Sequence, residues 1–222
     1  MKTLVIAPHP DDEMLGCGGT LLKKSKAGET VGWMIMTSMK KEDGWSTDKI
    51  NIREKEIEKV RKSLQIKKEN IFKLNFSPAK LDSYSEASII GLISEVFKKF
   101  QPQEILLPHS GDIHGDHRVC FNAVAACTKW FRFPYIKRVL TYETISESDA
   151  GIQNVNPFQP NTFIDISETL QKKWDILKIY ESEMQKFPFP RSEKAIKSLA
   201  RYRGSQAGFE AAEAFCLLKE RI

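Results

Sequence analysis

The chain has 222 residues, of which 41% are hydrophobic and 28% are charged, a composition typical of a soluble globular protein. Its length predicts a single domain that covers residues 1–222. The 34 basic and 29 acidic residues leave a net charge of only +5. Lysines alternate with glutamates, as in REKEIEKVRKSL, which indicates solvated helix faces and argues against a nucleic-acid partner.

Apolar runs and cysteines bear on the location of the protein. The sequence has no run of about 18 apolar residues, so we expect no membrane span. The N-terminal apolar run is too short for the core of a signal peptide. The four cysteines form no Cys-x-x-Cys pair, which argues against a zinc ribbon or a redox motif. We therefore expect reduced thiols and a cytoplasmic location.

Strand-like and helix-like segments alternate along the chain. The expected strands cover residues 3–8, 30–38, 71–76, 104–108, 138–145 and 162–167. The expected helices cover residues 12–28, 51–66, 85–100, 117–131, 167–184 and 194–204. The alternation predicts an α/β sandwich of three layers, with helices on both faces of a mostly parallel sheet. Residues 205–218 are not assigned.

Several local features accompany these segments. The pattern over 51–66 places Ile52, Ile57, Val60 and Leu64 on one apolar stripe. Ser167 is expected to cap the helix that follows it. The polar stretch KKEDGWSTDKIN, which contains Trp45, is expected to form a loop.

Two polar clusters follow expected strands. HPDDE comes directly after the first strand, and HSGDIHGDH comes directly after the fourth. In open α/β sheets, ligands bind beyond the carboxyl ends of the strands. Both clusters are therefore expected at the same edge of the sheet.

The first cluster combines one imidazole with three carboxylates. If the helix begins at Pro10, then Asp11, Asp12 and Glu13 lie in its first turn, where the helix dipole favours negative charge. Three carboxylates near a partly buried strand end still repel one another. A divalent cation removes that repulsion, and histidine with aspartate suits Zn²⁺ or Fe²⁺.

The second cluster holds three of the four histidines of the chain. A catalytic zinc site usually has three protein ligands, so His9, Asp12 and one later histidine supply the required number. We favour His117, because His114 is then free for proton transfer or oxyanion stabilisation. His109 is expected to form part of the pocket wall.

Three glycines, Gly16, Gly18 and Gly19, follow the acidic residues. A Gly-x-Gly turn after a first strand is also typical of dinucleotide-binding folds. Carboxylates at the helix start would repel a pyrophosphate. We therefore interpret these glycines as sites of close packing between helix and sheet.

Four motifs together resemble one family. APHPDDEMLGCGGTL, IREKE, GDIHGDHR and RYRGSQAGFEAAEAF are similar to the successive motifs of the PIG-L (LmbE-like) metal-dependent deacetylases. The resemblance implies a Rossmann-like fold. It also implies removal of the acetyl group from an N-acetylated amino sugar, often an N-acetylglucosamine conjugate. One departure is Pro8, where many members have a small residue, and we expect only a slight change in strand path.

The resemblance also implies roles for single residues. It implies His9, Asp12 and His117 as ligands of Zn²⁺, with Fe²⁺ or another divalent metal as alternatives. It implies Asp11 as the general base that accepts a proton from the attacking water.

For the second half of the reaction, the resemblance implies that His114 stabilises the oxyanion or protonates the leaving amine, with Asp116 tuning it. It implies that Arg53 lies near the sugar, and it makes Arg203 a substrate contact.

The chemistry of an amide agrees with such a site. A bound metal polarises the carbonyl and lowers the pKa of water to about 7. Two alternatives stay open: an amidase that cleaves a larger acyl group or a thiol-sugar conjugate, and a non-catalytic module of the Rossmann type that binds a nucleotide or sugar. Assembly into a homo-oligomer is also left open.

Overall fold

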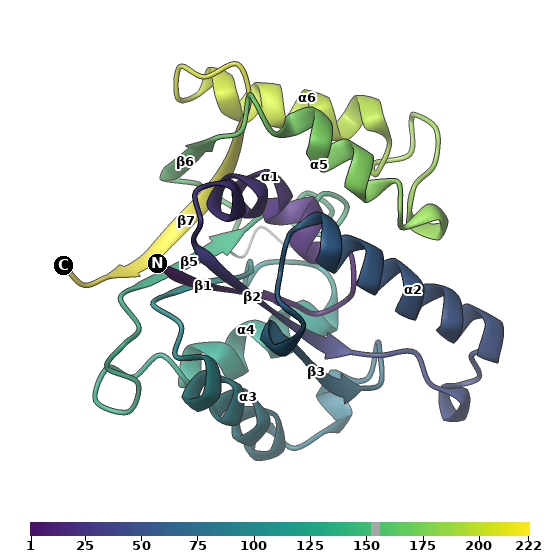
Figure 1. Ribbon diagram of the computed structural model, residues 1–222, viewed down its shortest axis with the longest axis vertical. Helices are drawn as coiled ribbons and strands as arrows, with labels where there is room; N and C mark the ends of the chain where they lie inside the picture. Colours follow the sequence, from purple (N-terminus) through teal and green to yellow (C-terminus); the bar gives the residue numbers. More distant parts are fainter. Residues whose placement is uncertain (152–155) are drawn as a thin grey trace.

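The computed structural model describes residues 1–151 and 156–222, and within them seven strands form one sheet. The strand order is β3-β2-β1-β4-β5-β7-β6 (Figure 1). Neighbouring strands from β3 to β5 pair in parallel, whereas β7 pairs antiparallel with both β5 and β6. The strands are β1 (Lys2–Ala7), β2 (Thr30–Thr37), β3 (Ile71–Phe76), β4 (Glu104–Pro108), β5 (Arg138–Tyr142), β6 (Thr162–Asp165) and β7 (Ala212–Glu220).

Helices cover both faces of the sheet (Figure 1). One face carries α1, α2, α5 and α6, and the other carries α3 and α4. The α-helices are α1 (Asp12–Lys26), α2 (Thr47–Ser63), α3 (Glu86–Phe100), α4 (Gly115–Ala126), α5 (Leu170–Leu177) and α6 (Glu193–Ser205). Short 3-10 turns are η1 (Lys41–Asp43), η2 (Lys68–Asn70), η3 (Leu81–Ser83) and η4 (Glu181–Glu183). The predicted three-layer α/β sandwich is confirmed.

The central strand β1 explains why the sheet needs two helical layers. Val5 and Ala7 pack into the core beneath α1 and α2, while Leu4 and Ile6 pack into the core beneath α3 and α4. All four side chains are fully buried. A strand buried on both faces reads as a continuous apolar run, which is what the sequence has here.

The C-terminal segment contains a strand that the sequence analysis did not assign. β7 lies between β5 and β6, so it is an interior strand of the sheet and not an edge strand. The first five residues of β7, AEAFC, are buried, and Glu213 is one of them. The glutamate makes this strand hard to predict from the sequence, because a buried charge is rare unless it is paired. Here Lys173 from α5 pairs with Glu213 at 2.7 Å.

The start of α1 agrees with the prediction, whereas two other helix positions were wrong. α1 begins at Asp12, the first residue of the predicted helix 12–28, so Pro10 lies before the helix and Asp11 takes the N-cap position. α2 begins at Thr47, inside the predicted loop, because the side chain of Ser46 accepts a hydrogen bond from the backbone of Lys49. Ser167 does not cap α5; its hydroxyl donates to Asp165, and the predicted helix is divided into α5 and η4.

The buried stripe of α2 is rotated from the predicted one. Ile57, Val60 and Leu64 are buried as expected, but Ile52 is 55% exposed. The neighbouring Arg53 is buried instead, at 6% exposure. Adjacent residues on a helix point about 100° apart, so the first turns of α2 present a polar face inward. No helix in the described part of the chain is both long and apolar enough to cross a membrane.

The glycines of α1 permit close contact with its neighbours, as predicted. A Cβ added to Gly16 would lie 2.1 Å from the ring of Tyr142. The tyrosine cannot easily move, because it is fully buried and its hydroxyl donates to the backbone oxygen of Ile6. A Cβ on Gly19 would likewise lie 2.8 Å from Ile166. This packing brings the start of α1 close to the sheet.

We expect Gly16→Ala to lower the free energy of unfolding by about 1–3 kcal/mol, since the added methyl overpacks the contact with Tyr142. Gly91 lies inside α3, and a Cβ there meets nothing within 4 Å. The control Gly91→Ala should therefore raise stability by about 0.5–1 kcal/mol. Urea denaturation measures both changes. Equal effects of the two substitutions would contradict the packing argument.

Candidate metal and catalytic site

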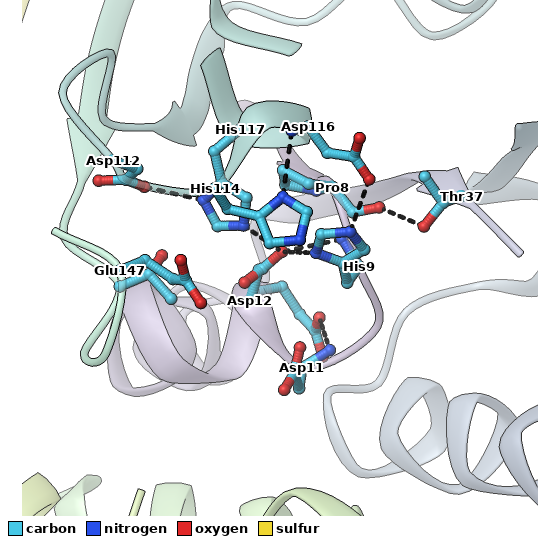
Figure 2. A network of polar contacts seen from close by, with 12 residues as sticks. Pro8, His9, Asp11, Asp12, Thr37, Asp112, His114, Asp116, His117 and Glu147 are labelled. Carbon is cyan, nitrogen blue, oxygen red and sulfur yellow. Dashed lines mark hydrogen bonds and ion pairs between the residues drawn. The ribbon is translucent and has the colours of Figure 1, made fainter. Parts of the chain in front are cut away.

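The two polar clusters meet at one edge of the sheet. His9 follows the end of β1, and the segment Asp112–His117 follows the end of β4, which pairs directly with β1. Figure 2 shows the side chains of His9, Asp12 and His117 pointing toward one another. They lie at the base of a cavity of about 240 Å³, whose walls also come from α2, η4 and the segment before α6. The predicted convergence of the clusters is thus present.

Three side chains from these clusters form a potential metal site. The nearest ligand atoms of His9, Asp12 and His117 all lie within 4.8 Å of one another. The Oδ2 atom of Asp12 lies 3.5 Å from Nδ1 of His9 and 3.3 Å from Nε2 of His117. Two imidazoles and one carboxylate fit a divalent cation such as zinc. A second group, His9, His114 and Asp116, also has its ligand atoms within 4.8 Å.

A buried carboxylate orients His117. Asp112 is fully buried, and its Oδ2 lies 2.8 Å from Nδ1 of His117. The hydroxyl of Ser148 donates to the other oxygen of Asp112 at 2.6 Å. Such a partner fixes the ring so that Nε2 faces the site. The sequence analysis missed Asp112, although the spacing Asp-x₄-His in GDIHGDH was a usable signal.

The charges of this cluster shift its pKa values strongly. Burial by itself lowers the pKa of His9, but Asp116 and Asp12 raise it to about 9. Burial likewise opposes charge on His117, but Asp12 and Asp112 raise its pKa to about 10. Burial alone would raise the pKa of Asp12, yet His117 and His9 hold it well below its usual range. Both histidines therefore carry protons at neutral pH that must leave before either ring donates to a cation.

We expect Zn²⁺ binding at pH 7 to release about two protons, because metal ligands must be deprotonated. Because the pKa values of His9 and His117 are about 9 and 10, protons compete with the metal below about pH 10, so the zinc affinity should decrease as the pH falls. Titration calorimetry in buffers of different ionisation enthalpy counts the protons. Binding without proton release would contradict the arrangement.

The backbone at Asp11 is strained and firmly held. Its φ of 130° lies in a region that residues other than glycine rarely adopt. The carboxylate of Glu13 accepts a hydrogen bond from the Asp11 N–H at 3.1 Å, and the hydroxyl of Tyr180 donates to Glu13 at 2.8 Å. The Asp11 carbonyl accepts from the first turn of α1. Glu13 is thus more than a helix-start charge, because it fixes the conformation of Asp11.

The carboxylate of Asp11 is buried beside an arginine that the sequence analysis missed. Nη1 of Arg191 donates to Oδ2 of Asp11 at 2.9 Å. Burial and the neighbouring Asp12 raise the pKa of Asp11 to about 7, with Arg191 acting in the opposite direction. A carboxyl with this pKa exchanges protons near neutral pH, as a general base requires. Arg191 lies in the irregular segment FPFPRS, which has no pattern that predicts a site.

His114 occupies the N-cap position of α4. Its Nδ1 accepts a hydrogen bond from the backbone of Asp116 at 3.1 Å, which assigns the ring proton to Nε2. Its ring centroid lies 4.6 Å from that of His9. Burial and then the charges on His9 and His117 lower the pKa of His114. A neutral ring that carries its proton on Nε2 is a hydrogen-bond donor beside the metal site.

Asp116 contacts different partners from those expected. Its carboxylate lies 2.9 Å from Nε2 of His9 and accepts hydrogen bonds from the backbones of Ala79 and Leu81. It reaches His114 through its backbone N–H rather than its side chain. Asp116 therefore orients His9 and anchors the loop after β3, and its effect on His114 is indirect.

The two predicted substrate arginines lie in different places. Arg53 lines the cavity. Arg203 does not: it forms two hydrogen bonds of 2.7 Å with Glu143 and stacks over Phe158. The structure therefore does not bring Arg203 into the cavity. His109 is also outside the lining, with its ring bonded to the backbone of Asn156.

The fold and this donor set are typical of hydrolases that use a divalent metal. The family model described as GlcNAc-PI de-N-acetylase, or PIG-L, matches residues 4–128. The chain belongs to this family, so the resemblance predicted from the motifs is confirmed.

Individual relatives extend this similarity over the full chain. The diacetylchitobiose deacetylase of Thermococcus kodakarensis is 30% identical over 225 residues, which cover 96% of this chain and 81% of the relative. The crystal structure of the conserved protein TT1542 from Thermus thermophilus is 25% identical, with a TM-score of 0.76, and the match covers 99% of this chain and 96% of that one. The N,N'-diacetylchitobiose deacetylase of Pyrococcus horikoshii is 24% identical with a TM-score of 0.77, covering 98% and 84% of the two chains, and this likeness concerns the fold.

Proposed function

We propose that this chain is a metal-dependent hydrolase that removes the N-acetyl group from an amino sugar. The observation that carries the proposal is the group His9, Asp12 and His117 in the cavity, in which Asp12 and His117 are buried and His9 is partly exposed, with Asp11 and His114 beside it. His9, Asp12 and His117 would hold the cation, with zinc as the preferred metal. When bound, a divalent metal polarises an amide carbonyl and acidifies water.

Asp11 acts as the general base. Its buried carboxylate lines the cavity, and its pKa of about 7 lets it accept a proton near neutral pH. Glu13 and Arg191 hold its backbone and its side chain, so the base is oriented before the substrate arrives. Removing a proton from the attacking water raises the nucleophilicity of the oxygen toward the amide carbon.

His114 acts on the carbonyl oxygen of the amide, whereas Asp11 acts on the attacking water. Its Nε2–H donates a hydrogen bond to the oxygen on which negative charge develops. An amide nitrogen leaves only after it gains a proton, and Asp11 can return to it the proton taken from water. The lowered pKa of His114 keeps the ring neutral, so His114 stabilises the developing charge as a hydrogen-bond donor and does not supply the proton.

The size of the cavity and the relative from Thermococcus support a small sugar as substrate. A cavity of about 240 Å³ is large enough for a group of monosaccharide size. The Thermococcus relative is a diacetylchitobiose deacetylase. Trp45 lines the cavity, in agreement with a role against a sugar ring.

The first test is acetate release from N-acetylglucosamine and N,N'-diacetylchitobiose, with zinc and with chelator. We expect Asp11→Asn to lower kcat by about 10²–10⁴-fold while zinc stays bound, because the variant keeps the shape of the side chain but is not a base. Metal analysis of the purified variant is the control. Loss of zinc from Asp11→Asn would mean that Asp11 is a ligand rather than the base.

Two histidine variants distinguish the two possible ligand groups. We expect His117→Ala to lose zinc, since His117 supplies one of three ligands and is oriented by Asp112. His114→Ala should retain zinc and lose most of its turnover. Metal content per chain and kcat measure the two effects. Retention of zinc by His117→Ala together with its loss from His114→Ala would assign the metal to His9, His114 and Asp116 instead.

A further inference from the structure

The charged groups of the cavity wall determine which substrates can enter. Among the described residues, the cavity is lined by two guanidinium groups, Arg53 and Arg191, and by five carboxylates. Arginine is the side chain that usually recognises a carboxylate or phosphate, through paired hydrogen bonds from its fork. The partners of these two arginines therefore decide whether the cavity can bind an anion.

Arg53 has an acceptor at each of its nitrogens. Nη1 donates to the backbone oxygen of Pro10 at 3.1 Å, and Nε lies 3.2 Å from the carboxylate of Glu56. Nη2 donates to Ser182 and to one oxygen of Glu183. The side chain is also buried against Tyr180. Arg53 thus holds α2, η4 and the start of α1 together.

Arg191 is occupied in the same way. Its Nη1 donates to Asp11 at 2.9 Å and lies 3.3 Å from the second oxygen of Glu183. Its Nε donates to the hydroxyl of Ser146 at 3.1 Å, and its Nη2 lies 3.5 Å from Glu147. Glu183 therefore pairs with both arginines, one on each carboxylate oxygen. The other negative partners are Glu56 for Arg53, and Asp11 and Glu147 for Arg191.

Negative charge remains in excess after these pairings. The five lining carboxylates belong to Asp11, Asp12, Glu54, Glu147 and Glu183. Glu56 adds a sixth carboxylate on Arg53 and Lys73 pairs with Glu54, so six carboxylates face three cationic side chains, a difference of three. One divalent cation does not fully offset this difference. A carboxylate or phosphate brought into the cavity would lose water and face these carboxylates without a vacant arginine fork on the described lining.

The rest of the wall suits an uncharged ligand. Met39, Trp45, Ile50 and Ile57 line the cavity on the side of α2. Apolar and aromatic side chains pack against the C–H faces of a sugar ring, while the carboxylates accept hydrogen bonds from its hydroxyl groups. This combination provides acceptors for hydroxyls but repels an anion.

We propose that the cavity selects amino sugars whose neighbouring group is uncharged, such as a second neutral sugar, and rejects those that carry a carboxylate or phosphate next to the sugar. Glu183 is the residue that sets this preference, because it is the carboxylate that pairs with both Arg53 and Arg191. The inference rests on the proposed deacetylase function.

The test uses two substrates that differ in one charge. The N-acetylglucosaminide of glycolamide is neutral, and that of glycolate has nearly the same shape but carries a carboxylate. We expect kcat/KM for the neutral compound to be at least about tenfold higher, mainly through KM, because the unfavourable charge acts on binding. Equal values, or a preference for glycolate, would overturn the inference. If neither compound nor diacetylchitobiose releases acetate with zinc present, the proposed function itself fails.

Glu183→Gln provides the second measurement. Removing this charge leaves Arg53 and Arg191 with one carboxylate fewer, so we expect the neutral-to-anionic ratio to fall by at least about fivefold. Glu181 lies in the same 3-10 turn, is exposed and does not line the cavity, so Glu181→Gln is the matched control and should keep the wild-type ratio. A ratio that is unchanged in folded Glu183→Gln would remove Glu183 from specificity. If that variant does not fold, the wild-type ratio still decides the main inference.

Discussion

The structure of the site depends on one buried carboxylate, Asp12, which two histidines from separate parts of the chain approach. His9 comes from the end of β1 and His117 from α4, and each lies within 3.5 Å of the same oxygen of Asp12. The parallel pairing of β1 with β4 brings these segments to one edge. Charges this close in a buried place are stable only with compensating partners. The negative charge of Asp12 attracts protons to His9 and His117, and it would attract a bound cation in the same way.

Around this centre, the protein holds its reactive groups through contacts to groups that do not react. Glu13 and Tyr180 fix the strained backbone of Asp11, and Arg191 fixes its carboxylate. The same pattern recurs for His117, which Asp112 orients. Backbone strain of this kind persists only when the surroundings determine the conformation, and it is concentrated at functional sites. The three carboxylates of the acidic run after β1 therefore have different partners: Arg191 for Asp11, the two histidines for Asp12, and the Asp11 backbone with Tyr180 for Glu13.

The charged side chains of the cavity wall are also held in ion pairs. Arg53 and Arg191 compensate buried carboxylates, and Glu183 links the two guanidinium groups. Arginines that stabilise the protein in this way are not available to a ligand. The excess of carboxylates then favours a cation at the base of the cavity and a neutral, hydroxyl-rich group above it.

The sequence by itself determined the α/β class, most strand positions, the family and the group His9, Asp12 and His117. These follow from apolar runs, alternation and motif spacing, which are local properties of the chain. Only the tertiary structure decided that β7 enters the sheet and that Arg203 pairs with Glu143 outside the cavity. It also decided which residues hold Asp11 and which charges line the wall, because contacts such as those of Arg191 with Asp11 and of Arg53 with Ser182 join segments more than a hundred residues apart. Such contacts produce no periodic pattern in the sequence.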